Sequence, residues 1–230
     1  MWQAWLQAFE FFLVPKPSPM YCPSHFQEDD PAVLRGLIEQ FPLGAVICQG
    51  ADGLVADHIP LRHEAVPDGL GRLVGHVARS NPLWQIAPEQ EVLVVFQGPS
   101  TYISPNWYAT KTESGKVVPT WNYAVVHAHC ELQAVHDPEQ ILNIVTELTE
   151  HHERTQSHPW SVADAPRDFT EKLLAHIVGV HLHVKRWQGK WKVSQNQPKA
   201  NQASVIEGLD NGPAEVQRQM ATLVRSHGAQ

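Results

Sequence analysis

The chain has 230 residues, of which 43% are hydrophobic and 18% are charged. This composition is typical of a globular protein with one main core and excludes an intrinsically disordered chain. The net charge of −7 argues against a simple DNA-binding function, because the molecule as a whole does not attract nucleic acid. The three cysteines are widely spaced and form no C-x-x-C motif, so we expect no disulfide framework, no structural zinc site and a cytoplasmic location.

The first nineteen residues differ in character from the rest of the chain. They are rich in Trp, Phe and Leu, they end in three prolines, and they lack the basic region and cleavage site of a signal peptide. The segment is too short to span a bilayer, and no other apolar segment approaches that length. We therefore expect residues 1–19 to be an extension outside the fold, in a soluble protein that does not enter a membrane.

The first half of the chain contains signals for one helix and several strands. Asp30-Pro31 provides an N-cap and a first-turn proline, which predicts a helix over residues 31–41. Short β-branched runs predict strands at residues 44–49, 54–61, 71–77 and 91–97, with a hairpin turn at residues 50–53. Residues 117–133 are predicted to form a long bent strand or a strand pair, with Pro119 at an edge or a bulge.

The second half alternates between helical and extended patterns. Helices are predicted after Asp137-Pro138 and over residues 167–176, and a last helix is predicted to start at Pro213. Residues 177–193 are predicted to form a hairpin around Gln188-Gly189, and residues 198–201 look like a linker. Six or seven strands with peripheral helices favour an antiparallel barrel over a doubly wound sheet. We divide the chain into residues 1–19, a domain over 20–197 and a C-terminal helical appendage over 198–230.

Two aromatic–proline clusters, Tyr102–Tyr108 and Val118–Tyr123, flank a short polar loop. Proline fixes the backbone and removes a donor, so neither cluster is predicted to be the middle of a helix or of a central strand. A rigid aromatic surface with a few polar groups suits a planar heteroaromatic ligand. The alternative is that Trp107 and Trp121 are ordinary core aromatics at a barrel edge.

These clusters also carry a family resemblance. The motifs, in order, are Met20-Tyr21-x-Pro23-x-His25-Phe26, Tyr102–Tyr108, Val118–Tyr123 with His127, and Lys192-x-Ser194-Gln195-Asn196. Over about residues 20–227 they resemble the PaiB-type FMN-binding negative transcriptional regulators, a branch of the flavin-binding split-barrel superfamily. The resemblance implies a mainly β protein with peripheral helices, built on a six-stranded antiparallel split β-barrel. It also implies a homodimer, FMN at the dimer interface and a regulatory function.

A protein that binds FMN needs cations or N–H donors at the phosphate, a flat clamp on the ring and donors at the ring edge. Arg79, Ser80 and Asn81 follow a predicted strand where the superfamily has a basic or hydroxyl residue, so we predict them at the phosphate. Lys192 and Ser194 share a strand face and are predicted to reach the phosphate or a flavin carbonyl. The alternatives are a solvated surface arginine and a solvated basic edge.

The second aromatic cluster contributes further predicted contacts to the flavin. Thr120 and Asn122 share one face of an extended segment and are predicted to address the flavin edge, while Trp121 points into the core or toward a partner subunit. Val118 and Pro119 complete this part of the cofactor-binding set.

Other residues allow more than one interpretation. His58 lies in a strand motif similar to that of the family and is predicted to line the pocket, although a lone strand histidine is more often hydrogen-bonded in the core. The polar loop with Lys111 and Lys116 is either a mobile lid over the ligand or an ordinary surface hairpin. The pairs His127-x-His129 and His181-x-His183 are compatible with binding of a transition metal ion or of a haem iron.

Three functions fit these observations. The first is an FMN-binding sensor or negative transcriptional regulator without turnover, and the second is an FMN-dependent oxidoreductase that acts on an unknown small molecule. The third is a haem-binding split barrel. Direct DNA binding is doubtful, because basic residues gather only at local edges such as residues 185–199. The chain has no G-x-G-x-x-G followed by a helix, no P-loop and no G-x-S-x-G motif.

Overall fold

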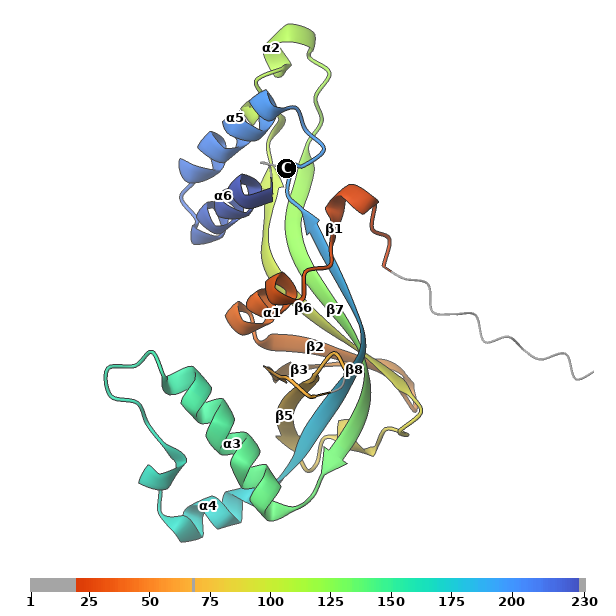
Figure 1. Cartoon of the computed structure of the whole chain (residues 1–230), viewed down its shortest axis with the longest axis vertical. Helices are drawn as coiled ribbons and strands as arrows, with labels where there is room; N and C mark the ends of the chain where they lie inside the picture. Colours follow the sequence, from red (N-terminus) through yellow and green to blue (C-terminus); the bar gives the residue numbers. More distant parts are fainter. Residues whose placement is uncertain (1–19, 68, 228–230) are drawn as a thin grey trace, which may run out of the picture.

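The structure is a computed structural model that describes residues 20–67 and 69–227 (Figure 1). The predicted extension, residues 1–19, lies outside the described residues. The described residues form one antiparallel sheet with peripheral helices, as predicted, but the sheet has eight strands rather than six. The strands are β1 (Gln27–Glu28), β2 (Leu43–Gly50), β3 (Gly53–Pro60), β4 (Arg62–Glu64), β5 (Arg72–Ala78), β6 (Glu91–Ile103), β7 (Thr120–Val135) and β8 (Ile177–Lys192).

The connection between β3 and β4 closes the sheet into a barrel. The strand order is β3-β2-β6-β7-β8-β5-β4, with β1 paired to β8, so β3 and β4 stand at opposite ends of the sheet. Only Leu61 separates Pro60 at the end of β3 from Arg62 at the start of β4. Consecutive Cα atoms are about 3.8 Å apart, so the sheet must curl until its two ends meet. Leu61 is 1% exposed, and β3 lies against β5.

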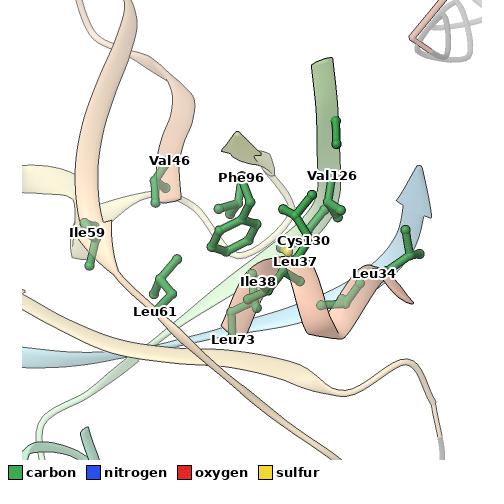
Figure 2. Close-up of a cluster of buried hydrophobic side chains, with 14 of the residues drawn as sticks. Leu34, Leu37, Ile38, Val46, Ile59, Leu61, Leu73, Phe96, Val126 and Cys130 are labelled. Carbon is green, nitrogen blue, oxygen red and sulfur yellow. The ribbon is translucent and has the colours of Figure 1, made fainter. Parts of the chain in front are cut away.

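The main core lies inside the barrel, where alternate residues of each strand point inward. Val46, Val94, Phe96 and Val126 come from three neighbouring strands, and each is 0% exposed. Figure 2 shows Leu34, Leu37 and Ile38 of α1 gathered with Phe96 and Val126 of the sheet. A second, smaller cluster lies under α3 and consists of Val74, Val135, Ile141, Ile144 and Leu148.

The helices begin where the capping signals predict. The Asp30 side chain accepts a hydrogen bond from the Ala32 N–H at 2.7 Å, and the Asp137 side chain accepts one from the Gln140 N–H at 2.9 Å. None of the helices in residues 20–67 and 69–227 has the length and apolar character needed to cross a membrane. The helices are α1 (Pro31–Gln40), α2 (Lys111–Ser114), α3 (Pro138–Glu153), α4 (Arg167–Leu174), α5 (Lys199–Asp210) and α6 (Glu215–His227).

The C-terminal helices pack into the main core. α5 begins at Lys199, so the predicted linker over residues 198–201 is wrong. Val205 and Leu209 of α5 and Met220 and Val224 of α6 are 0% exposed and belong to the main hydrophobic cluster. The division of the chain at residue 198 stays a prediction, and in Figure 1 these helices and α1 lie on one side of the long strands.

The predicted hairpin around Gln188-Gly189 is also wrong, because residues 177–192 form one continuous strand. Gly189 has a different function from a turn residue. A Cβ atom at this position would lie 2.4 Å from the Glu28 carbonyl oxygen and 2.4 Å from Cδ2 of Leu34. Gly189 therefore allows β1 and α1 to approach β8 closely.

The aromatic clusters lie partly within strands. β6 continues to Ile103 and includes Tyr102, and β7 begins at Thr120 and includes Trp121, so each cluster overlaps the end of a strand and neither forms the middle of a helix or of a strand, as predicted. The β6–β7 register shifts between Gln97 and Ser100. This irregularity accommodates Pro99, which cannot donate to a regular ladder.

We predict that Gly189→Ala lowers the free energy of unfolding by about 1–3 kcal/mol, because the added methyl group has no room. Gly36→Ala is the matched control. Gly36 lies within α1 and has nothing within 4 Å of an added Cβ, so alanine there is expected to stabilise the protein by about 0.5–1 kcal/mol. Urea denaturation of both variants measures the difference, and equal stability of Gly189→Ala and the wild type would contradict the close approach.

Candidate functional site

The outer face of the sheet carries most of the chemically distinctive side chains. Directly paired residues of neighbouring strands share a face, so one row across five strands can be followed residue by residue. The row contains His58, Ala45, Val95, His127 and Gln188. About three strand spacings, or roughly 14 Å, separate the two histidines of this row. We call this surface the outer face.

The middle of the outer face is apolar. Ala45 and Val95 lie between the two histidines, and Ile47 and Leu93 occupy the same strands in the next row. All four are half-buried, whereas the inward-pointing residues between them are fully buried. The structure therefore has an apolar strip with a histidine on either side.

His129 is held in a fixed orientation on this face. Its Nδ1 lies against the Glu91 carboxylate, and its Nε2 is 3.0 Å from Gln188 Oε1 and 3.0 Å from Arg186 Nη2. Burial lowers the pKa of the neighbouring His127, and the nearby His129 and Lys190 lower it further. The pair therefore offers one oriented imidazole and one that favours its neutral form.

One end of the outer face is aromatic and open to solvent. Trp121 and Tyr102 are 51% and 46% exposed, and their ring centroids are 6.3 Å apart in an edge-to-face arrangement. Trp121 therefore does not lie in the core of the single chain. Trp107 is packed instead, because its ring occupies the space next to Gly208 of α5.

Two lysines of β8, Lys190 and Lys192, lie near this end of the outer face. Lys190 Nζ donates to the Tyr21 carbonyl at 2.7 Å and lies 5.5 and 5.4 Å from the ring centroids of Tyr21 and Tyr123. Lys192 Nζ donates to the Trp121 carbonyl at 2.7 Å and to Thr120 Oγ1. Burial lowers the pKa of Lys192, and the charge of Lys190 lowers it further. Within the described residues neither ammonium group has an ion pair with an acid; Lys192 is half-buried, whereas Lys190 is 7% exposed.

Asn122 and Ser194 form a buried pair rather than part of the open surface. Asn122 is 0% exposed, and its Nδ2 donates to Ser194 Oγ at 2.8 Å. Asn122 therefore points inward rather than to an open flavin edge, while Trp121 points outward, which fits the expected alternative that it faces a partner subunit. Asn122 Oδ1 is buried with no hydrogen-bond partner, and Ser194 has a φ of 69°. A strained residue beside an unsatisfied acceptor is a feature of functional sites.

The rest of the Lys192-x-Ser194-Gln195-Asn196 motif joins the barrel to α5. The Gln195 side chain accepts from the Val193 N–H at 2.8 Å and donates to the Trp191 carbonyl at 2.5 Å. Asn201 Oδ1 accepts from the N–H and the hydroxyl of Thr110, both at 3.1 Å. Asn201 and Gln202 were not among the predicted site residues, although the five amide side chains within residues 195–202 indicate a hydrogen-bonding segment.

Arg79 lies at the opposite end of β8. Its Nε donates to the Ala175 carbonyl at 2.7 Å, and its Nη2 donates to the Ile177 carbonyl at 2.9 Å. Asn81 Oδ1 accepts from the Leu83 N–H at 2.8 Å and so caps the short helix Pro82–Gln85, while Ser80 is exposed. Among the described residues Arg79 has no acidic partner, so the turn presents a fixed, unbalanced cation.

Arg79 and Lys192 cannot hold the same phosphate within one chain. Arg79 bonds to Ile177, where β8 begins, and Lys192 is where β8 ends. The strand runs from the α4 end of the molecule to the α5 end (Figure 1), and its fifteen residue steps span about 50 Å. The prediction that both bind one phosphate is therefore wrong for a single chain, and only two copies could combine them.

The loop between the aromatic clusters projects from the end of the molecule. Lys111 Nζ donates to Asn106 Oδ1 at 2.6 Å, while Lys116, Val118 and Pro119 are exposed, Val118 to 73%. The base of the loop is tied to α5, because the Ala109 N–H donates to Ser204 Oγ at 3.1 Å. Its function as a lid stays a prediction.

The other histidine pair is occupied by protein groups. Arg72 Nη1 lies 3.2 Å from His181 Nδ1, and His183 Nε2 lies 2.9 Å from Gln133 Oε1. Burial, with the charge of Arg72, lowers the pKa of His181 to about 4. In the described part of the chain, no group of three or more His, Cys, Asp or Glu side chains is placed to hold a metal ion.

Sequence comparisons place the chain among flavin-binding proteins. Residues 20–186 match the family described as "Putative FMN-binding domain". An uncharacterised protein of Emericella nidulans is 32% identical, with 91% of this chain and 98% of the relative covered. The protease synthase and sporulation protein PAI 2 of Bacillus subtilis is 30% identical, with 89% of this chain and 96% of the relative covered.

Solved structures share the fold at low sequence identity. The FAD and haem binding protein of Mycobacterium smegmatis aligns with a TM-score of 0.53 and 17% identity, covering 72% of this chain and 73% of that one. The conserved hypothetical protein Rv2991 of Mycobacterium tuberculosis aligns with a TM-score of 0.52 and 12% identity, covering 77% of this chain and 94% of that one. These likenesses support the split-barrel fold alone.

We predict that Asn122 and Ser194 are energetically coupled. In a double-mutant cycle with Asn122→Ala and Ser194→Ala, the coupling free energy is expected to be about 0.5–1.5 kcal/mol, the net value of one buried hydrogen bond. Asn122→Ala combined with Ser157→Ala, in an exposed loop, is expected to be additive within about 0.5 kcal/mol. Urea denaturation measures both cycles, and additivity in the first would show that the pair contributes nothing.

Proposed function

This chain belongs to the PaiB-type FMN-binding family, and from that premise we propose that it is an FMN-binding sensor or negative regulator. In this proposal it acts as a homodimer, with the flavin between the outer faces of two copies. The observation that carries the proposal is the outer face itself, which combines a half-buried apolar strip, exposed aromatic rings and two lysines without acidic partners.

The residues of the outer face fit the chemical parts of a flavin. The apolar strip and the exposed indole of Trp121 offer flat surfaces to the isoalloxazine ring. Lys190 and Lys192 offer positive charge to the phosphate or to an electron-rich flavin oxygen. His58 and His127 border the strip and can contribute hydrogen bonds at the ring edge. A bound FMN would supply one- and two-electron redox chemistry.

The second copy is part of this proposal for two reasons. Trp121 and Tyr102 expose about half of their surface in the single chain, and burial of such rings is a common driving force for association. Arg79 is placed to anchor a phosphate, but it can share a ligand with Lys192 only if that lysine belongs to the second copy. A two-fold dimer provides two such shared sites.

The regulatory function is supported by the family and by the relative whose name refers to protease synthesis and sporulation. A second candidate function is an FMN-dependent oxidoreductase. The oriented His129, with the Glu91 carboxylate at its Nδ1, favours it, because an imidazole held in this way can move protons beside a redox centre. The three free thiols, Cys22, Cys48 and Cys130, support a location in the reducing cytoplasm.

The purified protein is expected to show flavin absorption near 450 nm, about the value for free flavin, and not a haem Soret band near about 400 nm. We predict that Arg79→Ala and Lys192→Ala each weaken FMN binding by about tenfold to a hundredfold, since each removes a charge-assisted contact. Fluorescence titration of FMN measures the affinity. Arg79→Lys, which loses the same contacts to Ala175 and Ile177 but keeps the charge, separates the loss of charge from the loss of structure.

A mixed dimer tests whether the site is shared. When Arg79→Ala and Lys192→Ala subunits are refolded together, one of the two interfacial sites regains both Arg79 and Lys192. The mixed dimer is therefore expected to recover one high-affinity site. A mixture of Arg167→Ala and Lys172→Ala subunits, altered at exposed positions of α4, is expected to bind as the wild type does. Failure of the first mixture to recover any affinity would exclude a site made from two copies.

We predict that direct DNA binding is weak, with a dissociation constant of about a micromolar or higher at physiological salt. Several of the local cations already have partners, since Lys185 pairs with Glu131 at 2.7 Å and Arg186 contacts His129. A salt titration with promoter and random duplexes measures affinity and selectivity. Nanomolar, sequence-selective binding would contradict indirect regulation through a metabolite, a partner or the redox state of the flavin.

A further inference from the structure

A small cationic cavity lies away from the outer face, where α1, β4 and α3 meet. Its volume is about 240 Å³, and its polar lining consists of Arg35, Glu39, Arg62, His63 and His151. Pockets for ligands of the size of a flavin have volumes of about 300–1,000 Å³, so this cavity suits a much smaller group. We call it the α1–α3 cavity.

Arg62 is only partly satisfied by its protein neighbours. Its Nη2 forms an ion pair with the Glu147 carboxylate of α3. Its Nε, in contrast, is buried and has no hydrogen-bond partner. Leaving a buried donor of a charged group unpaired costs free energy, so such a group usually has a partner. The ion pair with Glu147 therefore explains only part of the placement of Arg62.

The cavity carries an unbalanced positive charge because of Arg35. In the described ranges Arg35 has neither an ion pair nor a hydrogen bond from its side chain. The neighbouring acids are each paired with another arginine: Glu39 with Arg154 at 3.7 Å, Glu147 with Arg62, and Glu64 with Arg72 at 2.7 Å. In the described part of the chain the neighbouring acids are thus paired, and Arg35, an exposed side chain on the lining of the cavity, has no acidic partner.

The pKa values of the two histidines reflect their burial and the positive charges around them. Burial lowers the pKa of His63, and the charges of Arg35 and Arg62 lower it further, against a hydrogen bond to the Leu70 carbonyl that raises it. Burial also lowers the pKa of His151, together with the charge of Arg154. Both imidazoles therefore favour the neutral form until an anion arrives.

We propose that the α1–α3 cavity binds a phosphoryl group, either as free phosphate or as the head of a small phosphate monoester. The donors on offer are the guanidinium groups of Arg35 and Arg62 and the two imidazoles. A carboxylate has two oxygens, which a single arginine can bind in a bidentate pair. A phosphoryl group has at least three, which matches donors that converge from three different elements. This site is separate from the proposed flavin site.

The sign of the pH dependence follows from the same groups. A bound dianion raises the pKa of both histidines, so binding takes up protons and becomes tighter as the pH falls from about 8 to about 5. Sulfate shows this effect cleanly, because it remains a dianion throughout that range. The charged and titratable groups that act on the two imidazoles are Arg35, Glu39, Arg62, Glu64, His152 and Arg154.

Calorimetric titration of the full chain with sulfate and with inorganic phosphate tests the proposal. With the flavin site saturated with FMN, the wild type is expected to bind one sulfate per chain, and Arg35→Gln is expected to weaken that binding by about tenfold or more. Arg35 was chosen because it has no partner whose loss would affect folding. Arg167→Gln is the matched control: it makes the same substitution at an exposed helical arginine, 92% exposed at the side chain, and should leave binding unchanged.

The remaining measurements identify the source of the phosphoryl group. Tighter binding of glycerol 3-phosphate than of inorganic phosphate would indicate a phosphate monoester, and the reverse order would indicate free phosphate. Proton resonances of the His63 and His151 rings are expected to move together during either titration. The proposal is overturned if the wild type shows no saturable binding of sulfate or phosphate, or if Arg35→Gln and Arg167→Gln bind equally well. Unchanged flavin content in Arg35→Gln would confirm that the two sites are independent.

Discussion

The backbone hydrogen bonding of β8 is the constraint on which the other features of this protein depend. Backbone N–H and C=O groups that leave water must find partners, so a strand of sixteen residues requires neighbours along its whole length. β8 finds them in β7 on one side and in β5 and β1 on the other. It thereby fixes Arg79 at one end of the molecule and Lys192 at the other, and every site that would use both must be built from more than one chain.

The barrel gives its two faces different functions. The inner face is filled by residues with no exposed surface, such as Phe96 and Val126, and is further covered by α1, α5 and α6. The outer face holds groups that are costly to take partly or wholly out of water, namely the half-buried Lys192 and the buried Lys190, neither with an acidic partner in the described residues. Such groups are retained at a site of binding more readily than at a site of packing, because a core of the same size would be more stable without them.

The α1–α3 cavity differs from the outer face in both size and charge. It is formed by α1, α3 and the short strand β4, which follows β3 after Leu61 alone. The same closure that makes the barrel therefore also brings Arg62 next to Arg35 and His151.

The sequence by itself determined the features that depend on near neighbours in the chain. Asp30 and Asp137 marked helix starts, because a cap bonds to an N–H two or three residues away, and residues 50–53 marked a hairpin for the same local reason. The four motifs identified the family and the fold class. The sequence also indicated Arg79, Trp121 and Lys192 as candidate site residues, but it did not indicate how far apart they lie.

Only the tertiary structure decided the features that depend on distant residues. Gln188-Gly189 resembles a turn, yet Gly189 lies within a strand. A glycine is needed there because Glu28 and Leu34, more than 150 residues away, occupy the space that a side chain would take. Asn122 points inward because its side chain bonds to Ser194, 72 residues further along the chain, and this leaves Trp121 on the opposite, exposed face of β7. Arg35, Arg62 and His151 show no shared pattern in the sequence, and they meet because barrel closure places α1, β4 and α3 around one point.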